Sequence, residues 1–266
     1  MPGEYLQLSY WQVGLAVALI FINAGISLAF SLGLEKRLLI GSVRTVVQLL
    51  LIGWLLQWIF SHPLWYVVLP IMLCMAVIAG TSAVSRTTRR YPGIYLDSVL
   101  SVMATAIVVL SIAVLGIFRL EPWYAPRHAL PILGIILGNA LNGISLGLRQ
   151  FGDDLATHRQ QVEMLFTLGA TRWEAARPFV RKAIQTGMVP IINSMMVVGL
   201  VSLPGIMTGQ ILSGIAPIEA VKYQIVVMFL IASGAAMGTV GVVLLCYRRL
   251  FTTDHQFLYE RLRKKD

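Results

Sequence analysis

Seven long apolar runs constrain the fold of this sequence more than any other feature. A helix needs about 20 mostly apolar residues to span the hydrocarbon core of a bilayer. Only 12% of the 266 residues are charged, whereas soluble domains average about 25% charged residues. Apolar residues make up 57% of the chain, compared with about 45–50% in soluble domains. The sequence therefore predicts an all-α polytopic membrane protein with about seven transmembrane helices. The runs cover about 9–32, 38–60, 64–83, 96–118, 128–148, 188–213 and 222–247.

The chain is expected to form one transmembrane domain over residues 1–266, with a basic tail at about 248–266. The first run is too long for the apolar region of a signal peptide, and it lacks a basic stretch before it, because Glu4 is the only charged residue there. We therefore count it as a span.

The Lys and Arg residues indicate the orientation, because basic residues gather in cytoplasmic loops. With seven spans and the N-terminus outside, 17 of the 21 basic residues fall inside; Arg44 lies in a span, and Arg119, Arg127 and Lys222 fall outside. The opposite orientation would invert this bias. We therefore expect a multi-pass cell-membrane protein with its C-terminus in the cytoplasm. The net charge of +9 then reflects topology and not nucleic-acid binding.

The sequence completes no motif for enzyme chemistry. The stretch GNALNG has the glycine spacing of a phosphate-binding loop, but Ile144 stands where the motif requires Lys, and only Ser145 fits the Ser/Thr position that follows. The four histidines are scattered, and Cys74 and Cys246 lie in different runs without a metal-binding or redox spacing. We expect a chain that is not an enzyme, has no nucleotide site or cofactor of its own, and offers no assignable metal ligands.

Polar and small residues within the runs are candidates for a translocation path or for helix packing. Ionisable residues inside a membrane are functional candidates, although Arg44 is close enough to a span end to reach the interface. Two amides three residues apart, Asn139 and Asn142, need either a partner helix or a wet cavity. The candidates are Gly41, Arg44, Gln48, Asn139, Asn142, Asn193, Ser202, Pro204 and Gly205.

The sixth run, NSMMVVGLVSLPGIMTGQILSG, is expected to break near its middle. Pro204 removes a backbone donor, and Gly205 follows it directly. Broken helices in membranes usually line a cavity or face protein. Methionines crowd the same region, and they are either flexible packing residues or soft-metal ligands. They are Met188, Met195, Met196 and Met207.

The segment at about 150–187 is the only long internal cytoplasmic loop, and its charges keep it out of the bilayer. It is predicted to form two helices joined at Gly169, because glycine suits the left-handed position past a helix end. Asp153 or Asp154 is expected to cap the first helix. Thr171 and Glu174 form a capping box that opens the second.

The second helix of this loop is two-faced, with Trp173, Ala176 and Val180 on its apolar side. Three interpretations are open. The face could bind a cytosolic ATPase, lie flat on the membrane, or cover the ends of the spans. We favour the first, because a sharp corner between two helices fits a protein groove better than a flat bilayer.

Two resemblances point to a transporter. The spacing of Glu163 and Gly169 resembles the E-A-A-x-x-x-G coupling loop by which ABC-transporter permeases dock on their ATP-binding subunit, although Met164 and Leu165 replace both alanines. The sixth run and the stretches AVKYQIVVMFL, VRTVVQLLLIG and LGNALNGISLGL resemble the FetB-type permeases over about residues 35–250. These are bacterial iron-export permeases related to plant aluminium-tolerance proteins.

The resemblance implies a homodimeric permease that works with a separate cytosolic ATP-binding subunit, which would hold ATP and Mg²⁺. On this basis Glu163, Gly169, Thr171, Trp173 and Glu174 are the expected ATPase-coupling residues. Some family members have charged residues where this chain has Asn193 and Met196, so no metal ligand carries over.

The function expected is therefore the permease half of an ABC exporter for iron or another metal species. The alternatives are an ABC permease for an organic solute, such as a sugar nucleotide or drug, and a channel or secondary transporter that uses no ATPase.

Overall fold

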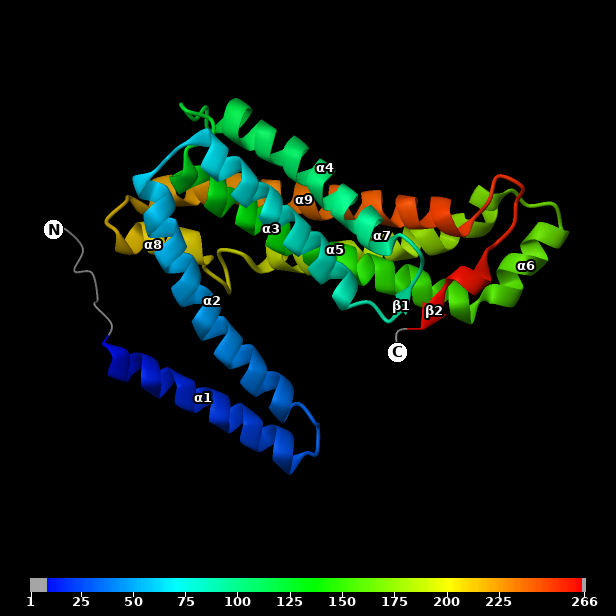
Figure 1. The fold of residues 1–266 in the computed structure, drawn as a ribbon, viewed down its shortest axis with the longest axis horizontal. Helices are drawn as coiled ribbons and strands as arrows, with labels where there is room; N and C mark the ends of the chain where they lie inside the picture. Colours follow the sequence, from blue (N-terminus) through cyan, green and yellow to red (C-terminus); the bar gives the residue numbers. More distant parts are fainter. Residues whose placement is uncertain (1–8, 265–266) are drawn as a thin grey trace. The chain divides into compact units, whose positions relative to one another are not determined.

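The computed structural model of the chain describes residues 9–264 and is helical almost throughout (Figure 1). It separates into two compact units. The first comprises the chain up to Pro63 together with Leu212–Ile215, and the second comprises Leu64–Ile211 and the chain from Ala216 onward.

The first unit is a pair of long apolar helices, α1 (Tyr10–Ala29) and α2 (Glu35–Ser61). Their connection is fixed by the buried Ser27, whose hydroxyl accepts from the backbone N–H of Leu34 and donates to the Glu35 carboxylate. Most other side chains of both helices are exposed within the chain, with Ile59 as a buried exception. This is expected for helices whose surroundings are lipid or protein rather than water.

The second unit contains the remaining helices and a two-stranded sheet. The sheet pairs β1 (Arg89–Arg90) with β2 (Arg263–Lys264) in antiparallel register, so the C-terminal tail folds back beside the α3–α4 connection. The helices are α3 (Trp65–Ser85), α4 (Ile94–Ser111) with a π-helical continuation at Ile112–Ile117, α5 (Pro126–Thr157), α6 (Arg159–Thr167), α7 (Arg172–Val197), α8 (Gly205–Leu212) and α9 (Pro217–Leu250).

Six helices among the described residues are long and apolar enough to cross a membrane: α1, α2, α3, α4 with its continuation, α5 and α9. The sixth of the seven expected spans is instead divided between the second half of α7 and the short α8. The expected break is confirmed and lies between Val197 and Gly205. Gly199 there has φ +82°, and its N–H donates to the carbonyl of Ser202 at 2.9 Å.

Helices α5, α7 and α9 form the centre of the second unit, and glycines allow their close approach. A Cβ on Gly187 of α7 would lie 2.7 Å from the carbonyl oxygen of Gly143 on α5 and 2.5 Å from Cγ2 of Thr239 on α9. Moving along α5 from Gly143 to Gly147, the contacts on α7 move backwards from Gly187 to Ala183. Helix α7 therefore runs antiparallel to α5.

The same kind of contact orients α9 and α4. Gly234 and Gly238 of α9 meet Ile136 and Ile144 of α5 in the same order, so α5 and α9 are parallel. Helix α4 is antiparallel to α9, because Asp97 pairs with Arg249 and the Ser101 hydroxyl donates to the carbonyl of Gly238. Because α5 and α9 are parallel, the end of α5 and the start of α9 lie at opposite ends of the unit. Helices α7 and α8 carry the chain from one end to the other.

Two expectations about the loop are wrong. Asp153 and Asp154 do not cap a helix, because α5 continues without a break to Thr157 and both lie in its last turns. Asp154 is instead buried and accepts from Gln150 and from the Lys182 ammonium at 3.0 Å. The apolar face of α7 is not a docking face at Ala176 and Val180, because both are buried in the core of the unit.

Candidate functional site

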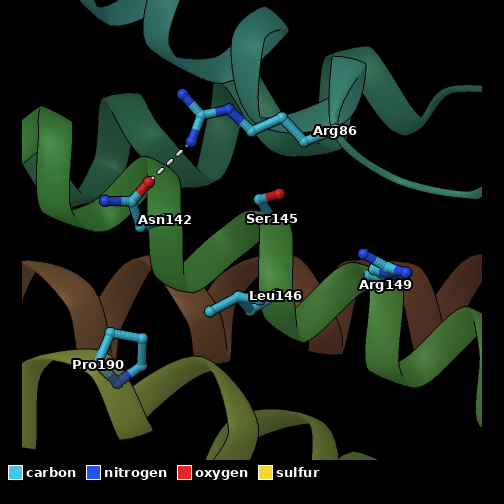
Figure 2. A pocket seen from close by; sticks show the side chains of 6 residues that line it. All are labelled: Arg86, Asn142, Ser145, Leu146, Arg149 and Pro190. Carbon is cyan, nitrogen blue, oxygen red and sulfur yellow. Dashed lines mark hydrogen bonds between the residues drawn. The ribbon is translucent and has the colours of Figure 1, made fainter. Parts of the chain in front are cut away.

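A polar pocket of about 330 Å³ opens between the end of α3, the middle of α5 and α7. Figure 2 shows its lining: Arg86, Asn142, Ser145, Leu146, Arg149 and Pro190. Four of these residues come from α5, where three- and four-residue steps place Asn142, Ser145 and Arg149 on one helical face. The pocket therefore follows a polar stripe along a helix that is otherwise largely apolar.

Arg86 closes one end of the stripe. It is the residue that follows the last turn of α3, and its Nη1 donates to the side-chain oxygen of Asn142 at 2.8 Å (Figure 2). An arginine at the end of one span thus meets an amide inside another. Asn142 is a neutral acceptor, and within residues 9–264 Arg86 forms no ion pair, so its charge has no counter-charge there.

Arg149 stands at the other end of the stripe, seven residues further along α5. The nearest carboxylate is that of Asp153, whose Oδ2 lies 3.8 Å from its Nε. The Asp153 carboxylate is also shared, because its Oδ1 lies 3.3 Å from Nε of Arg89 and accepts from the Thr88 hydroxyl at 2.8 Å. One carboxylate therefore serves two arginines, and Arg149 is the more distant.

The other expected path residues are distributed over the chain. Asn139 lies about one turn before Asn142 on α5, and its side-chain amide donates to the carbonyl of Ile135 at 3.0 Å. Asn193 is exposed on α7. Ser202, Pro204 and Gly205 belong to the break and the start of α8, and Gly41, Arg44 and Gln48 are exposed on α2 in the first unit. Of the nine candidates, only Asn142 lines the pocket.

On sequence alone, Arg86 and Arg149 counted only as topology markers, and Ser145 was named only as a residue that follows the GNALNG stretch. The Asn142–Ser145–Arg149 spacing could have identified the α5 stripe. The sequence contains no comparable signal for Arg86, because the contact joins residues 56 positions apart.

The α6–α7 corner is the second candidate site, and its geometry follows from local sequence. Gly169 has φ +87°; its N–H donates to the carbonyl of Phe166, and the N–H of Ala170 donates to that of Leu165, both at 3.0 Å. These two bonds make a Schellman motif, which ends α6.

The capping box then starts α7 as expected. The Thr171 hydroxyl accepts from the N–H of Glu174, and the Glu174 carboxylate accepts from the N–H of Thr171 at 2.8 Å. The Thr171 hydroxyl also donates to this carboxylate at 2.7 Å, and the hydrogen bonds that the backbone N–H and the hydroxyl of Thr171 donate lower the pKa of Glu174. Together the two motifs fix both sides of the corner.

The outer surface of the corner is apolar and exposed. Leu168 is 75% exposed, Met164 55% and Trp173 43%, whereas the α7 residues behind them are buried. Glu163, also exposed, forms an ion pair of 2.6 Å with Arg159 one turn earlier on α6.

The inner surface of the corner rests on α9 and the tail. The Trp173 ring meets Tyr247 edge-on with centroids 5.4 Å apart, and Phe166 meets Phe251 at 6.3 Å. The N–H of Arg172, which lacks an intrahelical partner at this position, donates to Nδ1 of His255 at 2.9 Å. A displacement of the corner would therefore act directly on the end of a spanning helix.

Candidate metal ligands do not gather anywhere in residues 9–264: no three His, Cys, Asp or Glu side chains lie close enough together to hold an ion. Three methionines, Met195, Met207 and Met228, line an apolar pocket of about 460 Å³ beside Gln224. The buried Oε1 of Gln224 has no hydrogen-bond partner among the described residues.

The sequence matches the Uncharacterised protein family UPF0014 over residues 10–251. The chain belongs to the UPF0014 family. A UPF0014 membrane protein of Synechocystis sp. is 33% identical over 97% of this chain and 100% of its own length. The "Probable iron export permease protein FetB" of Escherichia coli is 32% identical over 96% of both chains. The protein ALUMINUM SENSITIVE 3 of Arabidopsis thaliana is 32% identical over 91% of this chain and 88% of its own.

These UPF0014 relatives confirm the resemblance to FetB-type permeases and plant aluminium-tolerance proteins, and with the helical fold they show a polytopic membrane protein. No solved structure is similar to this chain.

Proposed function

We propose that the chain is the permease subunit of an ABC exporter for iron or another metal species and that a separate cytosolic ATP-binding subunit drives it. The observation that carries this proposal is the α6–α7 corner. It is fixed on both sides by local motifs, apolar and exposed on its tip, and packed from behind against the end of α9. A partner that binds Met164 and Leu168 would transmit its movement to the end of α9 through Trp173 and Phe166.

The orientation that we propose rests on where the basic residues lie in the second unit. The helix directions place the end of α3, the start of α4, the end of α5, the start of α7 and the end of α9 together. Most of the unit's basic residues flank these five ends, whereas Arg119, Arg127 and Lys222 flank the opposite ends. The first set faces the cytoplasm in our proposal, which puts the N-terminus outside and the corner where an ATPase can reach it.

A homodimer is part of the same proposal. Asn142 and Asn193 are exposed in the single chain although they lie on helices that cross or enter the membrane. Polar groups at membrane depth need protein or a water-filled cavity beside them. A second copy facing α5 and α7 would supply both and would place the path between the two protomers.

The cargo that we propose is taken from the name of a relative. The name of the E. coli relative contains iron export, which makes iron the first candidate. An organic solute is the second candidate, and the arginine-lined pocket favours it because that lining contains no carboxylate.

The test is a pull-down of a co-expressed ATP-binding subunit that carries a Walker A sequence, combined with ATP-driven export in vesicles. We expect Leu168→Glu and Met164→Glu each to reduce both recovery of the subunit and transport. Ile218→Glu is the matched control, because it makes the same change at a residue 63% exposed at the opposite end of the unit. Wild-type recovery and transport in the two corner variants would refute the proposal.

A further inference from the structure

The chemistry of the pocket between α3, α5 and α7 indicates what it binds. Its polar lining consists of two guanidinium groups, one amide and one hydroxyl, and no residue that lines it is acidic. A free divalent cation would meet two positive charges there and no anionic ligand, although hard cations are bound by carboxylates and carbonyl oxygens. The lining suits an anion.

The charges of the two arginines are available to a ligand. Arg86 donates to the side-chain oxygen of Asn142, which is neutral, and Arg149 lies 3.8 Å from a carboxylate that Arg89 approaches more closely. Guanidinium groups bind carboxylate and phosphate oxygens through two parallel hydrogen bonds. Ser145, buried to 7% exposure between the two arginines, adds a hydroxyl within the same pocket.

The spacing of the arginines favours an extended anion. Arg86 is held at Asn142, and Arg149 leaves α5 seven residues later, which is about 10 Å along the helix axis. A ligand with two separated acidic groups matches this spacing better than a small monoanion does. The pocket volume of about 330 Å³ accommodates a molecule of that kind.

We infer that this pocket binds an extended polyanion through carboxylate or phosphate oxygens contacted by Arg86 and Arg149. The consequence for cargo rests on the proposed transport function. A metal that passes this pocket would travel as an anionic complex and not as a free cation. The same oxygens occur in soluble anions and in phospholipid headgroups, so the experiment has an arm for each source.

Binding is measured on the full-length chain in nanodiscs of neutral phosphatidylcholine, titrated calorimetrically with citrate, pyrophosphate and Fe²⁺ separately. We expect the two anions to bind and Fe²⁺ alone not to compete with them. Arg86→Gln and Arg149→Gln should each weaken anion binding roughly tenfold or more, the usual effect of losing a charged hydrogen bond. Arg248→Gln, which removes one charge from an exposed residue outside the pocket, should leave binding unchanged.

Asn142→Asp is the sharpest variant, because it keeps the size of the side chain and turns the neutral partner of Arg86 into an anion. We expect it to fold, to show a wild-type size-exclusion profile and to lose anion binding. Anion binding that persists in this variant and in both arginine variants would overturn the inference, as would absence of binding by the wild type in both arms.

The lipid arm uses nanodiscs that contain phosphatidylglycerol, followed by mass spectrometry of the intact complex. Retention of anionic lipid by the wild type but not by Arg86→Gln would support the anion site and assign its occupant to a headgroup. Retention of lipid equally by all variants, with citrate binding dependent on the arginines, would support a soluble anion.

Transport separates this inference from the proposed function. Arginine-dependent binding without any ATP-driven transport would leave the site in place and refute the exporter. ATP-driven transport at wild-type rate in Arg86→Gln, Arg149→Gln and Asn142→Asp would leave the exporter in place and overturn the role of the pocket.

Discussion

Asp97 and Arg249, 152 positions apart, form a salt bridge of 2.6 Å between Oδ2 and Nε that ties the start of α4 to the end of α9. The Asp97 side chain is 3% exposed, and its second partner is the Tyr91 hydroxyl at 3.0 Å. Burial raises the pKa of Tyr91, so that hydroxyl stays protonated and continues to donate. The carboxylate has thus two donors and almost no contact with solvent.

We predict that Arg249→Gln destabilises the fold, because it leaves Asp97 charged and buried without a counter-ion. The expected loss of unfolding free energy is about 2–3 kcal/mol, less than the roughly 3–5 kcal/mol of a fully buried pair, since Arg249 is 40% exposed. Thermal unfolding of the detergent-solubilised protein measures it. Asp97→Asn combined with Arg249→Gln should recover part of the loss, and Arg248→Gln should cost little. An additive double variant would show that the pair is not coupled.

Capping of α7 by Thr171 and Glu174 should depend on pH. The pKa of Glu174 is lowered in the folded chain, so its contribution is complete above the ordinary Glu range and is lost as the pH falls through the lower, folded value. We expect hydrogen exchange in the first turn of α7 to be slow at neutral pH and to show this loss of protection under acid. Glu174→Gln should remove the pH dependence. Thr171→Ala should weaken the cap by about 0.5–2 kcal/mol at all pH values.

The glycine contact between α5 and α7 should tolerate no side chain. A Cβ on Gly187 would lie 2.7 Å from the carbonyl oxygen of Gly143, and backbone cannot move aside as a side chain can. We predict that Gly187→Ala costs at least about 1–3 kcal/mol, the usual penalty of overpacking, and lowers the yield of monodisperse protein. Gly138→Ala is the matched control, because nothing lies within 4 Å of its Cβ position. Equal yields for the two variants would contradict the packing.

The elements that could be predicted from sequence are those encoded locally. Apolar run length predicted the spans, Pro204 and Gly205 indicated the broken one, and Gly169 and the Thr171–Glu174 box predicted the corner almost to the residue. Each depends on residues within a few positions of one another, and local backbone preferences suffice to specify them.

Long-range pairings could not be predicted in the same way. Arg86 with Asn142 and Asp97 with Arg249 join different helices, and nothing in the spacing of either residue names its partner. The apolar face of α7 was recognised as a face, but Val180 packs against the chain's own spans. Periodicity identifies an apolar side and does not reveal what covers it.

Orientation in the membrane is testable with two single cysteines in a chain that carries Cys74→Ala and Cys246→Ala. Thr157→Cys lies at the exposed end of α5, and Ile218→Cys lies in the exposed first turn of α9. A membrane-impermeant maleimide added to intact cells should label Ile218→Cys alone, and both should label after the membrane is opened. Labelling of Thr157→Cys in intact cells would show that the orientation is the opposite one.

The corner at Gly169 should control coupling rather than folding. Its φ of +87° disfavours any residue with a Cβ, yet no atom lies within 4 Å of the Cβ position, so a substitution there introduces backbone strain and no collision. We predict that Gly169→Val costs about 1–2 kcal/mol, all of it local. The strain should shift α6 relative to α7 and displace Leu168, while the core behind Phe166 still folds.

Gly169→Asn is the matched variant, because Asn tolerates the left-handed region far better than Val. We expect wild-type expression and size-exclusion behaviour from both variants. Recovery of the ATP-binding subunit should fall strongly for Gly169→Val and only slightly for Gly169→Asn, and ATP-driven transport should fall in the same order. An equal effect of the two would mean that the open surface around Gly169, and not its backbone angle, matters for the partner. No effect of either would mean that the angle between α6 and α7 is not what the ATPase recognises.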